Sequence, residues 1–264
     1  AITQALVRLT YDQGITILYE SEVDEIVLKE GRARGVISKG KIYEADVVVS
    51  NMDVYFTWHK LLKNIPPPER TLNQERSSSA LIFYWGIKKT FKELSLHNIF
   101  FAADYRKEFE ELFQHKRVSD DPTIYVNITS KYIASDAPAD CENWFVMINV
   151  PAMEGQDWDA IIAKARKNIL TKLSRQLKTN VESLIENESV LDPRSIEQRT
   201  NSYKGALYGT SSNSRYAAFL RHGNHSKLIP NLYFCGGSVH PGGGIPLCLQ
   251  AARITSNLVS KHFK

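Results

Sequence analysis

Residues Leu232–Gln250 have the sequence LYFCGGSVHPGGGIPLCLQ, which joins an apolar, strand-like run to helix-compatible sequence through a turn rich in glycine. Glycines can adopt positive φ angles and let backbone N–H groups approach a ligand closely. Pro246 suits the first turn of a helix, and the start of a helix attracts anionic groups such as phosphate. Helical spacing after the turn places these residues on one face: Leu247, Ala251, Ile254 and Leu258. The stretch therefore predicts a ligand site where strand, turn and helix meet; the alternative is a glycine-rich connection that binds nothing.

The composition is that of an ordinary globular protein. The chain has 264 residues, 43% of them hydrophobic and 23% charged, enough for one large domain or two modest ones. Its net charge of +4 is small and scattered, which argues against nucleic acid as a partner but leaves an anionic membrane surface open. Cys141, Cys235 and Cys248 lack the spacing of a metal site or a disulfide framework, so we expect no metal site and a reducing compartment. No apolar run is long enough to predict a membrane span.

The first fifty residues predict a helix followed by short strands. Apolar residues at helical spacing predict the helix over Ile2–Gln13, which Gly14 would end. Short apolar runs predict strands over Ile15–Tyr19, Glu22–Leu28, Ala33–Ser38, Lys41–Tyr43 and Val47–Val49, the last covered on both faces. Asn51 and Asp53 follow this last strand, where chemistry usually lies in an α/β sheet. The simpler interpretation is that they cap a helix over Val54–Leu62.

The middle of the chain has a different pattern, which begins after Pro66-Pro67-Pro68, where we place a crossing between domains. Aromatic-rich runs predict the strands of a broad antiparallel sheet: Ser79–Ile87, Asn98–Ala102, Thr123–Thr129 and Trp144–Val150. A helix is expected over Arg106–Gln114, and a second from Asp157 to about Leu177. The second helix would turn an apolar face inward and a basic face outward, including Lys172. A solvated surface is the simplest interpretation of that basic face.

Together these features resemble the C-terminal half of a bacterial carotenoid desaturase, a phytoene-desaturase-like member of the FAD-dependent amine oxidase superfamily. Segments in the order typical of the family carry the resemblance: Glu22-Val23 with Ile26, Val49–Asp53, Tyr203 with Gly205, Tyr208 and Gly209, and Asn231-Leu232-Tyr233 with Gly236, His240-Pro241-Gly242 and Gly244-Ile245-Pro246. The match spans nearly the whole chain. Within the family, Leu207–Ser214 and Phe234–Ser238 look most like the hydroxycarotenoid and γ-carotene-type desaturases.

The resemblance implies an α/β (α+β) fold. One part would be a piece of a Rossmann-like FAD-binding domain, at residues 1–53 and 206–264. The other would be a substrate-binding domain at residues 54–205, with a mostly antiparallel sheet covered by helices. The family begins with a strand, a Gly-x-Gly-x-x-Gly turn and a helix for the FAD pyrophosphate, and this unit is absent from the sequence. We therefore expect the remainder of the same enzyme, N-terminal to Ala1, as a partner of this chain.

The resemblance also implies which residues contact FAD. Main-chain groups of Val23 would meet the adenine, and Gly236 and Gly237 would lie beside the ribityl–pyrophosphate portion. Related amine oxidases often have an acidic residue where this chain has Gly237, so backbone amides would have to serve there. At the helix start, backbone groups would meet the N1/O2 edge of the flavin, from Gly244, Ile245, Pro246 and Leu247. Tyr208 and Gly209 would face the ring from the substrate side.

The activity implied by the resemblance is FAD-dependent dehydrogenation of a C40-type polyene, such as phytoene or a 1-hydroxy or cyclised carotenoid. Hydride would pass to the flavin and a proton to water or a weak base, so no catalytic residue is assigned; His240 is more simply interpreted as packed or capping. Five aromatic residues are candidates to line an apolar substrate tunnel, or simply form the core of the sheet: Phe83, Tyr84, Trp85, Phe100 and Phe101. A flavin-dependent carotene isomerase would use the same parts. The non-enzymatic alternative is a lipid-binding escort protein of the same fold.

The same substrate class implies a location. A C40 polyene is nearly insoluble in water, so an enzyme that oxidises it must collect it from a bilayer. We therefore expect a cytoplasmic protein that lies on the inner face of the cell membrane, with lysines and arginines attracted to anionic head groups. The contact is expected in the middle domain, between Leu61 and Asn201.

Overall fold

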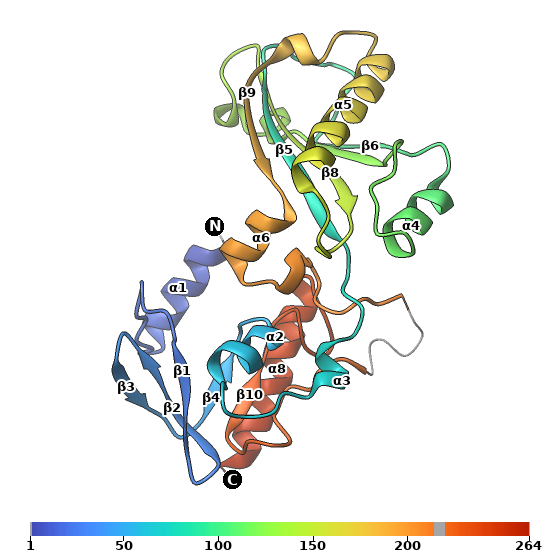
Figure 1. Ribbon diagram of the computed structural model, residues 1–264. Helices are drawn as coiled ribbons and strands as arrows, with labels where there is room; N and C mark the ends of the chain where they lie inside the picture. The colour runs from blue at the N-terminus through green and yellow to red at the C-terminus, as the bar shows by residue number, and fades with distance from the viewer. Residues whose placement is uncertain (1, 214–219, 264) are drawn as a thin grey trace.

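The computed structural model describes residues 2–213 and 220–263, so Ser214 from the segment compared above lies outside the described residues. The chain forms two lobes, one above the other in Figure 1. The lower lobe contains both ends of the chain, and the upper lobe contains the middle. The mixture of helices, one larger antiparallel sheet and two smaller sheets confirms the expected α/β class.

The lower lobe begins with a helix and a small antiparallel sheet. Helix α1 (Ile2–Asp12) is followed by the sheet β1-β2-β3, made of β1 (Glu25–Lys29), β2 (Arg32–Ser38) and β3 (Lys41–Glu44). The strand predicted over Ile15–Tyr19 was wrong, because none of the described strands pairs with these residues and their apolar side chains Ile15, Leu18 and Tyr19 are exposed. A short apolar run does not make a strand without a neighbouring strand to share its hydrogen bonds.

A parallel strand pair forms the centre of the lower lobe. β4 (Val48–Ser50) runs beside β10 (Leu232–Phe234), with Leu232 opposite Val48 and Phe234 opposite Ser50. The expectation that the valine run is covered on both faces was wrong, because Val49 is exposed. Among the described strands, β10 is the only one that is hydrogen-bonded to β4. Both strands end at the same edge of this pair, which places the residues after Ser50 next to those after Phe234.

A short helical segment follows β4 and belongs to the core of the lower lobe. It consists of α2 (Val54–Phe56) and the π-helical turn η1 (Thr57–Leu61), and the carboxylate of Asp53 accepts a hydrogen bond from the Tyr55 N–H, which confirms the predicted cap. α3 (Glu69–Leu72) comes next. The core contains residues from all of these elements together with β4 and β10, including Val54, Trp58, Leu72, Val48 and Phe234. Residues 54–72 thus pack in the lower lobe, and the division into FAD-binding and substrate-binding domains stays a prediction.

The upper lobe is built on a five-stranded antiparallel sheet with the order β6-β7-β8-β5-β9. Its strands are β5 (Ser79–Ile87), β6 (His97–Phe100), β7 (Ile124–Asn127), β8 (Glu142–Val150) and β9 (Ile185–Leu191). β9 was not predicted, because its sequence IENESVL is mostly polar and lies at an edge of the sheet. Shorter turns of 3₁₀-helix connect these elements: η2 (Thr129–Lys131), η3 (Ala134–Asp136) and η4 (Glu182–Leu184).

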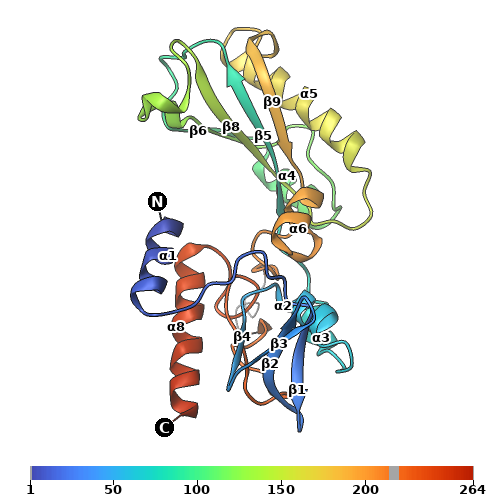
Figure 2. The same cartoon turned by 90° about the vertical axis from the view of Figure 1, so that its left-hand side faces the viewer.

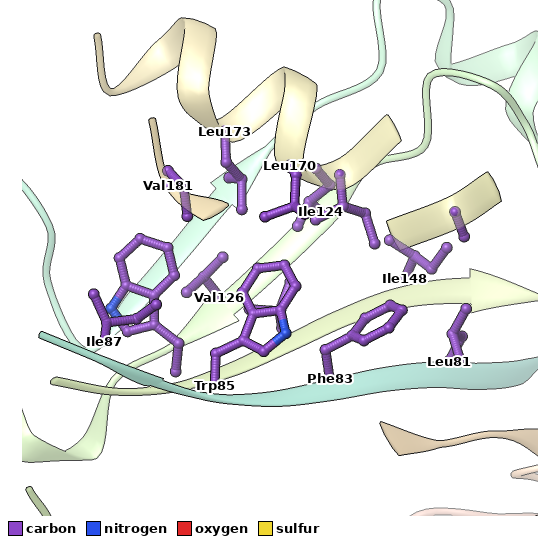
Figure 3. Close-up of a cluster of buried hydrophobic side chains, with 14 of the residues drawn as sticks. Leu81, Phe83, Trp85, Ile87, Ile124, Val126, Ile148, Leu170, Leu173 and Val181 are labelled. Carbon is purple, nitrogen blue, oxygen red and sulfur yellow. The ribbon is translucent and has the colours of Figure 1, made fainter. Parts of the chain in front are cut away.

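Helix α5 (Trp158–Gln176) covers one face of this sheet (Figure 2). Figure 3 shows the core between them, where Phe83 and Trp85 from β5 lie under Leu170 and Leu173 from α5. The predicted cap is confirmed, since the Asp157 carboxylate accepts a hydrogen bond from the Ala160 N–H. Lys172 is not on the solvated face as expected. It is buried and donates to Asp121 Oδ1 at 2.7 Å and to the Pro122 carbonyl at 2.9 Å, and this pairing makes its burial tolerable.

The chain returns to the lower lobe through α6 (Pro193–Thr200) and η5 (Tyr203–Gly205), which lie between the lobes in Figure 1. On the other side of the upper lobe, α4 (Tyr105–Phe113) connects β6 to β7. The last element is α8 (Ile245–His262). No helix among residues 2–213 and 220–263 combines the length and the apolar character needed to cross a bilayer.

Candidate functional site

The glycine turn lies at the carboxyl ends of the parallel strands β4 and β10, and helix α8 begins directly after it. Gly244 is the N-cap of α8 with φ +93°, and Pro246 stands in the first turn, as the sequence predicted. The Cys235 N–H donates to the Ser50 carbonyl at 3.0 Å, so the turn starts where the strand pair stops. In open α/β sheets, ligands bind at such carboxyl ends, next to a helix N-terminus.

The structure brings the predicted substrate-side residues to this turn. A Cβ atom at Gly243 would lie 2.8 Å from the Tyr208 Cα, and one at Gly209 would lie 2.7 Å from the Ser238 Cα. Backbone is thus packed directly on backbone, which only glycine permits. Gly236 packs against the side chain of Asn51. Val23 lies in the lower lobe, packed against the core that includes Phe234 and Val239.

The start of α8 is open in front. A Cβ atom at Gly244 would meet no other atom within 4 Å, and the side chains of Ile245 and Leu247 are exposed. Leu247, which helical spacing places on one face with Ala251, is exposed, and the buried line of α8 runs through Ala251 and Thr255, whose hydroxyl donates to the Phe234 carbonyl at 2.7 Å. The first N–H groups of a helix have no partner within the helix. Together with the open space, they fit an electron-rich group such as the N1/O2 edge of a flavin.

A cavity of about 210 Å³ lies beside the turn and is lined from both lobes. Phe113 at the end of α4 and Ser77 in the connection to β5 contribute from one side, and Tyr208, Gly243 and Leu247 from the other. The cavity therefore brings the upper lobe, the return segment and the start of α8 to one place.

Arg221 is buried in the wall of this cavity without a carboxylate partner among the described residues. Its Nη1 donates to the Tyr208 carbonyl at 2.9 Å, and its Nη2 to the Thr210 carbonyl at 2.6 Å, so it fixes the return segment. Within the described part of the chain, its Nε has no hydrogen-bond partner. Burial, with the nearby charge of Arg76, lowers the pKa of Arg221, but a guanidinium stays protonated in proteins.

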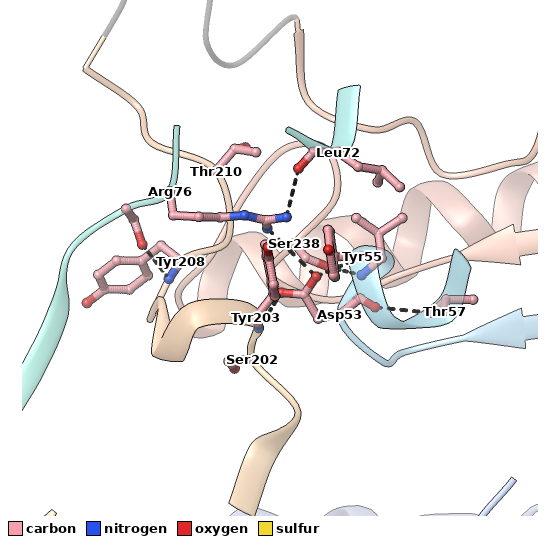
Figure 4. A network of polar contacts seen from close by, with 12 residues as sticks. Asp53, Tyr55, Thr57, Leu72, Arg76, Ser202, Tyr203, Tyr208, Thr210 and Ser238 are labelled. Carbon is pink, nitrogen blue, oxygen red and sulfur yellow. Dashed lines mark hydrogen bonds and ion pairs between the residues drawn. The ribbon is translucent and has the colours of Figure 1, made fainter. Parts of the chain in front are cut away.

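A second buried arginine ties the return segment to the lower lobe (Figure 4). The Arg76 guanidinium donates to the Leu72 carbonyl at 3.0 Å, lies 3.8 Å from Asp53 Oδ1 and covers the ring of Tyr203, which stacks on Tyr55. Asp53 also accepts hydrogen bonds from the backbone N–H groups of Tyr55 and Tyr203. The hydrogen bond to Tyr203 and, to a smaller extent, burial raise the pKa of Tyr55 to about 12, so this hydroxyl stays neutral at physiological pH.

Arg76 and Arg221 are the functional candidates that sequence reasoning missed. Each is a single arginine in a loop. Arg76 meets Asp53 and Tyr203, which are far away along the chain, and Arg221 bonds to the loop residues Tyr208 and Thr210. No motif could have indicated them. With Asp53 as the nearby carboxylate, the two guanidinium groups leave a net positive charge close to the glycine turn.

His240 sits in the turn with its main chain held on both sides. Its N–H donates to the His222 carbonyl at 2.9 Å, and its carbonyl accepts from Asn224 Nδ2 at 2.9 Å. His222 is buried and accepts a hydrogen bond from Trp58 Nε1 at 3.1 Å, and burial lowers the pKa of His222. These contacts give His240 a structural position in the turn.

The aromatic candidates for a substrate tunnel separate into two groups. Phe83 and Trp85 are buried between the sheet and α5, and Phe100 packs against the same core. These three serve the fold. Tyr84 and Phe101 are exposed, on the other face of β5 and just before α4.

Comparisons with known proteins give consistent relatives. No family model matches the sequence. The chain is 53% identical over 258 residues to a 1-hydroxycarotenoid 3,4-desaturase from Flavobacterium sp. (strain P99-3), an alignment that covers 98% of this chain and 53% of that protein. It is 30% identical over 284 residues to a phytoene desaturase from Fusarium fujikuroi, covering 98% of this chain and 50% of that one. The chain thus spans about half the length of these relatives.

The fold also has a solved counterpart. An oxidoreductase from Methanosarcina mazei superimposes with a TM-score of 0.62 at 12% identity, covering 96% of this chain and 53% of that one. At this identity the match concerns the fold alone. It shows that both lobes of the chain occur together in an oxidoreductase of about twice the length.

Proposed function

The chain belongs to the carotenoid desaturase family, and from this premise we propose that it forms part of an enzyme that desaturates a C40-type polyene with FAD as the oxidant. We use the term complete enzyme for this chain together with the part of its relatives' length that it does not span. The observation that carries the proposal is the open start of α8 at Gly244, in a chain 53% identical to a 1-hydroxycarotenoid desaturase. That relative favours a 1-hydroxylated carotenoid as the substrate.

The residues proposed to hold FAD are those at the turn and at the start of α8. Gly236 and Gly237 would lie beside the ribityl–pyrophosphate portion, and the backbone from Gly244 to Leu247 beside the flavin ring. Val23 would meet the adenine, and Tyr208 and Gly209 the substrate side of the ring. When bound, FAD would supply an acceptor for two electrons.

This chain's own groups would then stabilise charge and position the substrate. Desaturation removes two hydrogens from adjacent carbons, one with its electron pair and one as a proton, and forms a double bond. The helix start and the buried guanidinium groups of Arg76 and Arg221 would favour negative charge at the turn, where the flavin edge would be held. Because the positive charge left on the polyene is spread over conjugated bonds, water is a sufficient proton acceptor.

The remainder of the enzyme is proposed to pack against α1 and α8. Helix α1 buries none of its residues, although Ile2, Leu6 and Leu9 form an apolar face. Ile245 and Leu249 at the start of α8 are exposed as well. Apolar helix faces of this kind are normally covered in a folded domain.

The product mass tests the proposed reaction. The complete enzyme, loaded with FAD and supplied with a 1-hydroxycarotenoid in vesicles, is expected to yield a product that has lost two hydrogens, measured by chromatography and mass spectrometry. A product of unchanged mass would show an isomerase. Binding of the carotenoid without any conversion would show an escort protein.

We further propose that the complete enzyme works at the inner face of the cell membrane, because its substrate must come from a bilayer. Ion pairs neutralise part of the basic face of α5, such as Arg166 with Glu182 and Glu188, so the attraction should be weak. The same vesicles test this, since sedimentation with anionic but not neutral lipid, weakened by salt, is expected. An enzyme left in the supernatant with both lipids would contradict it.

A further inference from the structure

Four aromatic rings form a row along one side of α4. Phe101, Tyr105, Phe109 and Phe113, which we call the aromatic row, are spaced four residues apart, so those on the helix share one face. Successive ring centroids are 6.2, 4.8 and 5.8 Å apart. The first three side chains are 66%, 52% and 36% exposed. An uninterrupted aromatic surface of this kind marks a binding site more often than a solvated one.

The opposite side of α4 anchors the helix in its lobe. Leu112 is buried, and the buried carboxylate of Glu108 accepts hydrogen bonds from the Thr123 N–H at 2.9 Å and the Thr123 hydroxyl at 2.6 Å. Lys116, just after the helix, pairs with Glu75 at 2.7 Å and ties this end to the connection between the lobes. These contacts hold the helix in place. None of the described elements buries its aromatic side.

The row ends at the candidate site. Phe113 lines the cavity that also contains Tyr208, Gly243 and Leu247, and the other rings lead from there to the exposed Phe101. A path of flat apolar surface thus connects the outside of the upper lobe with the glycine turn. The row itself carries no charge, and its neighbours on α4 include both signs, Arg106 and Lys107 beside Glu110 and Glu111.

We propose that the aromatic row is the track along which one linear polyene lies on its way into the cavity at the glycine turn. The inference rests on the proposed function and adds to it the residues that hold the substrate outside the reacting bonds. Flat rings suit the flat face of a conjugated chain and bury large apolar area with little loss of conformational freedom. The mixed charges beside the row favour a neutral occupant over an anionic head group.

The test uses the complete enzyme with Phe109→Ser and, as the matched control, Tyr132→Ser, which removes an aromatic side chain that is 78% exposed in the same lobe and outside the row. Lycopene in phosphatidylcholine vesicles is the probe, and quenching of tryptophan fluorescence measures its binding. We expect Phe109→Ser to weaken binding about tenfold and to raise KM for the carotenoid substrate similarly, with kcat within about twofold. Tyr132→Ser should match the unchanged enzyme.

Three outcomes would overturn the inference. Equal binding in Phe109→Ser and Tyr132→Ser would show that the row does not hold the polyene. If Phe109→Ser lost as much binding to vesicles without lycopene as to vesicles with it, the row would insert into the membrane instead. If Phe109→Ser lowered the unfolding temperature but bound lycopene normally, the row would be merely structural. None of these depends on catalysis. If the unchanged enzyme binds lycopene but alters no carotenoid, the proposed function fails while the track remains.

Discussion

Replacing Gly244 with valine in the complete enzyme is expected to remove most of the bound flavin. Gly244 has φ +93°, which a branched residue adopts only at a cost of roughly 1–3 kcal/mol. In addition, the new side chain would occupy the open space in front of the α8 N-terminus, where we place the flavin edge. Flavin per protein, measured by absorbance after denaturation, should fall on the order of tenfold.

The chain offers a matched control for this change. Gly155, in the loop before α5, has φ +89°, and a Cβ atom there would also meet nothing within 4 Å. Gly155→Val therefore introduces the same backbone strain in the same open surroundings, but away from the turn. It should lose a similar amount of stability and keep its flavin. Loss of flavin in both variants, or in neither, would contradict our placement of the cofactor at Gly244.

Phe83→Ala is expected to destabilise the protein strongly, by about 3–5 kcal/mol. Phe83 is fully buried in the core between the sheet and α5, beside Trp85 at a ring distance of 5.5 Å (Figure 3). Removing the ring forfeits its burial and leaves a cavity that a close-packed core cannot fill. The free energy of unfolding in urea, measured on the complete enzyme, provides the value.

Tyr84→Ala is the control on the same strand. Tyr84 points to the other face of β5 and is exposed, so its loss should cost less than about 1 kcal/mol. Similar values for both variants would contradict the assignment of Phe83 to the core. A destabilised Phe83→Ala enzyme whose folded fraction also bound carotenoid poorly would give this ring a second role that its position does not explain.

The parts predicted from sequence are those that depend on neighbouring residues. Asp53 and Asp157 were recognised as caps because a cap bonds to N–H groups two or three residues away. The start of α8 was recognised because a glycine with a proline two residues later suits the start of a helix. The caps and the helix start are therefore determined by residues close to one another in the sequence.

The parts that were missed depend on partners far away in the sequence. Ile15–Tyr19 and β9 differ in whether another strand lies beside them, and this is decided by the tertiary fold. Arg76 reaches Tyr203, and Lys172 reaches Asp121, through contacts that no short pattern records. The turn itself could be predicted from its residues, whereas the charge around it required the structure.

Mixing the oxidised complete enzyme with a 1-hydroxycarotenoid in the absence of oxygen tests the central claim most directly. The claim is that electrons leave the polyene and arrive at a flavin held by the glycine turn. The flavin absorbance should bleach as the carotenoid gains its double bond, with one flavin reduced for each bond formed. A carotenoid that is converted while the flavin stays oxidised, or a flavin that stays oxidised with the carotenoid bound and unchanged, would contradict the account.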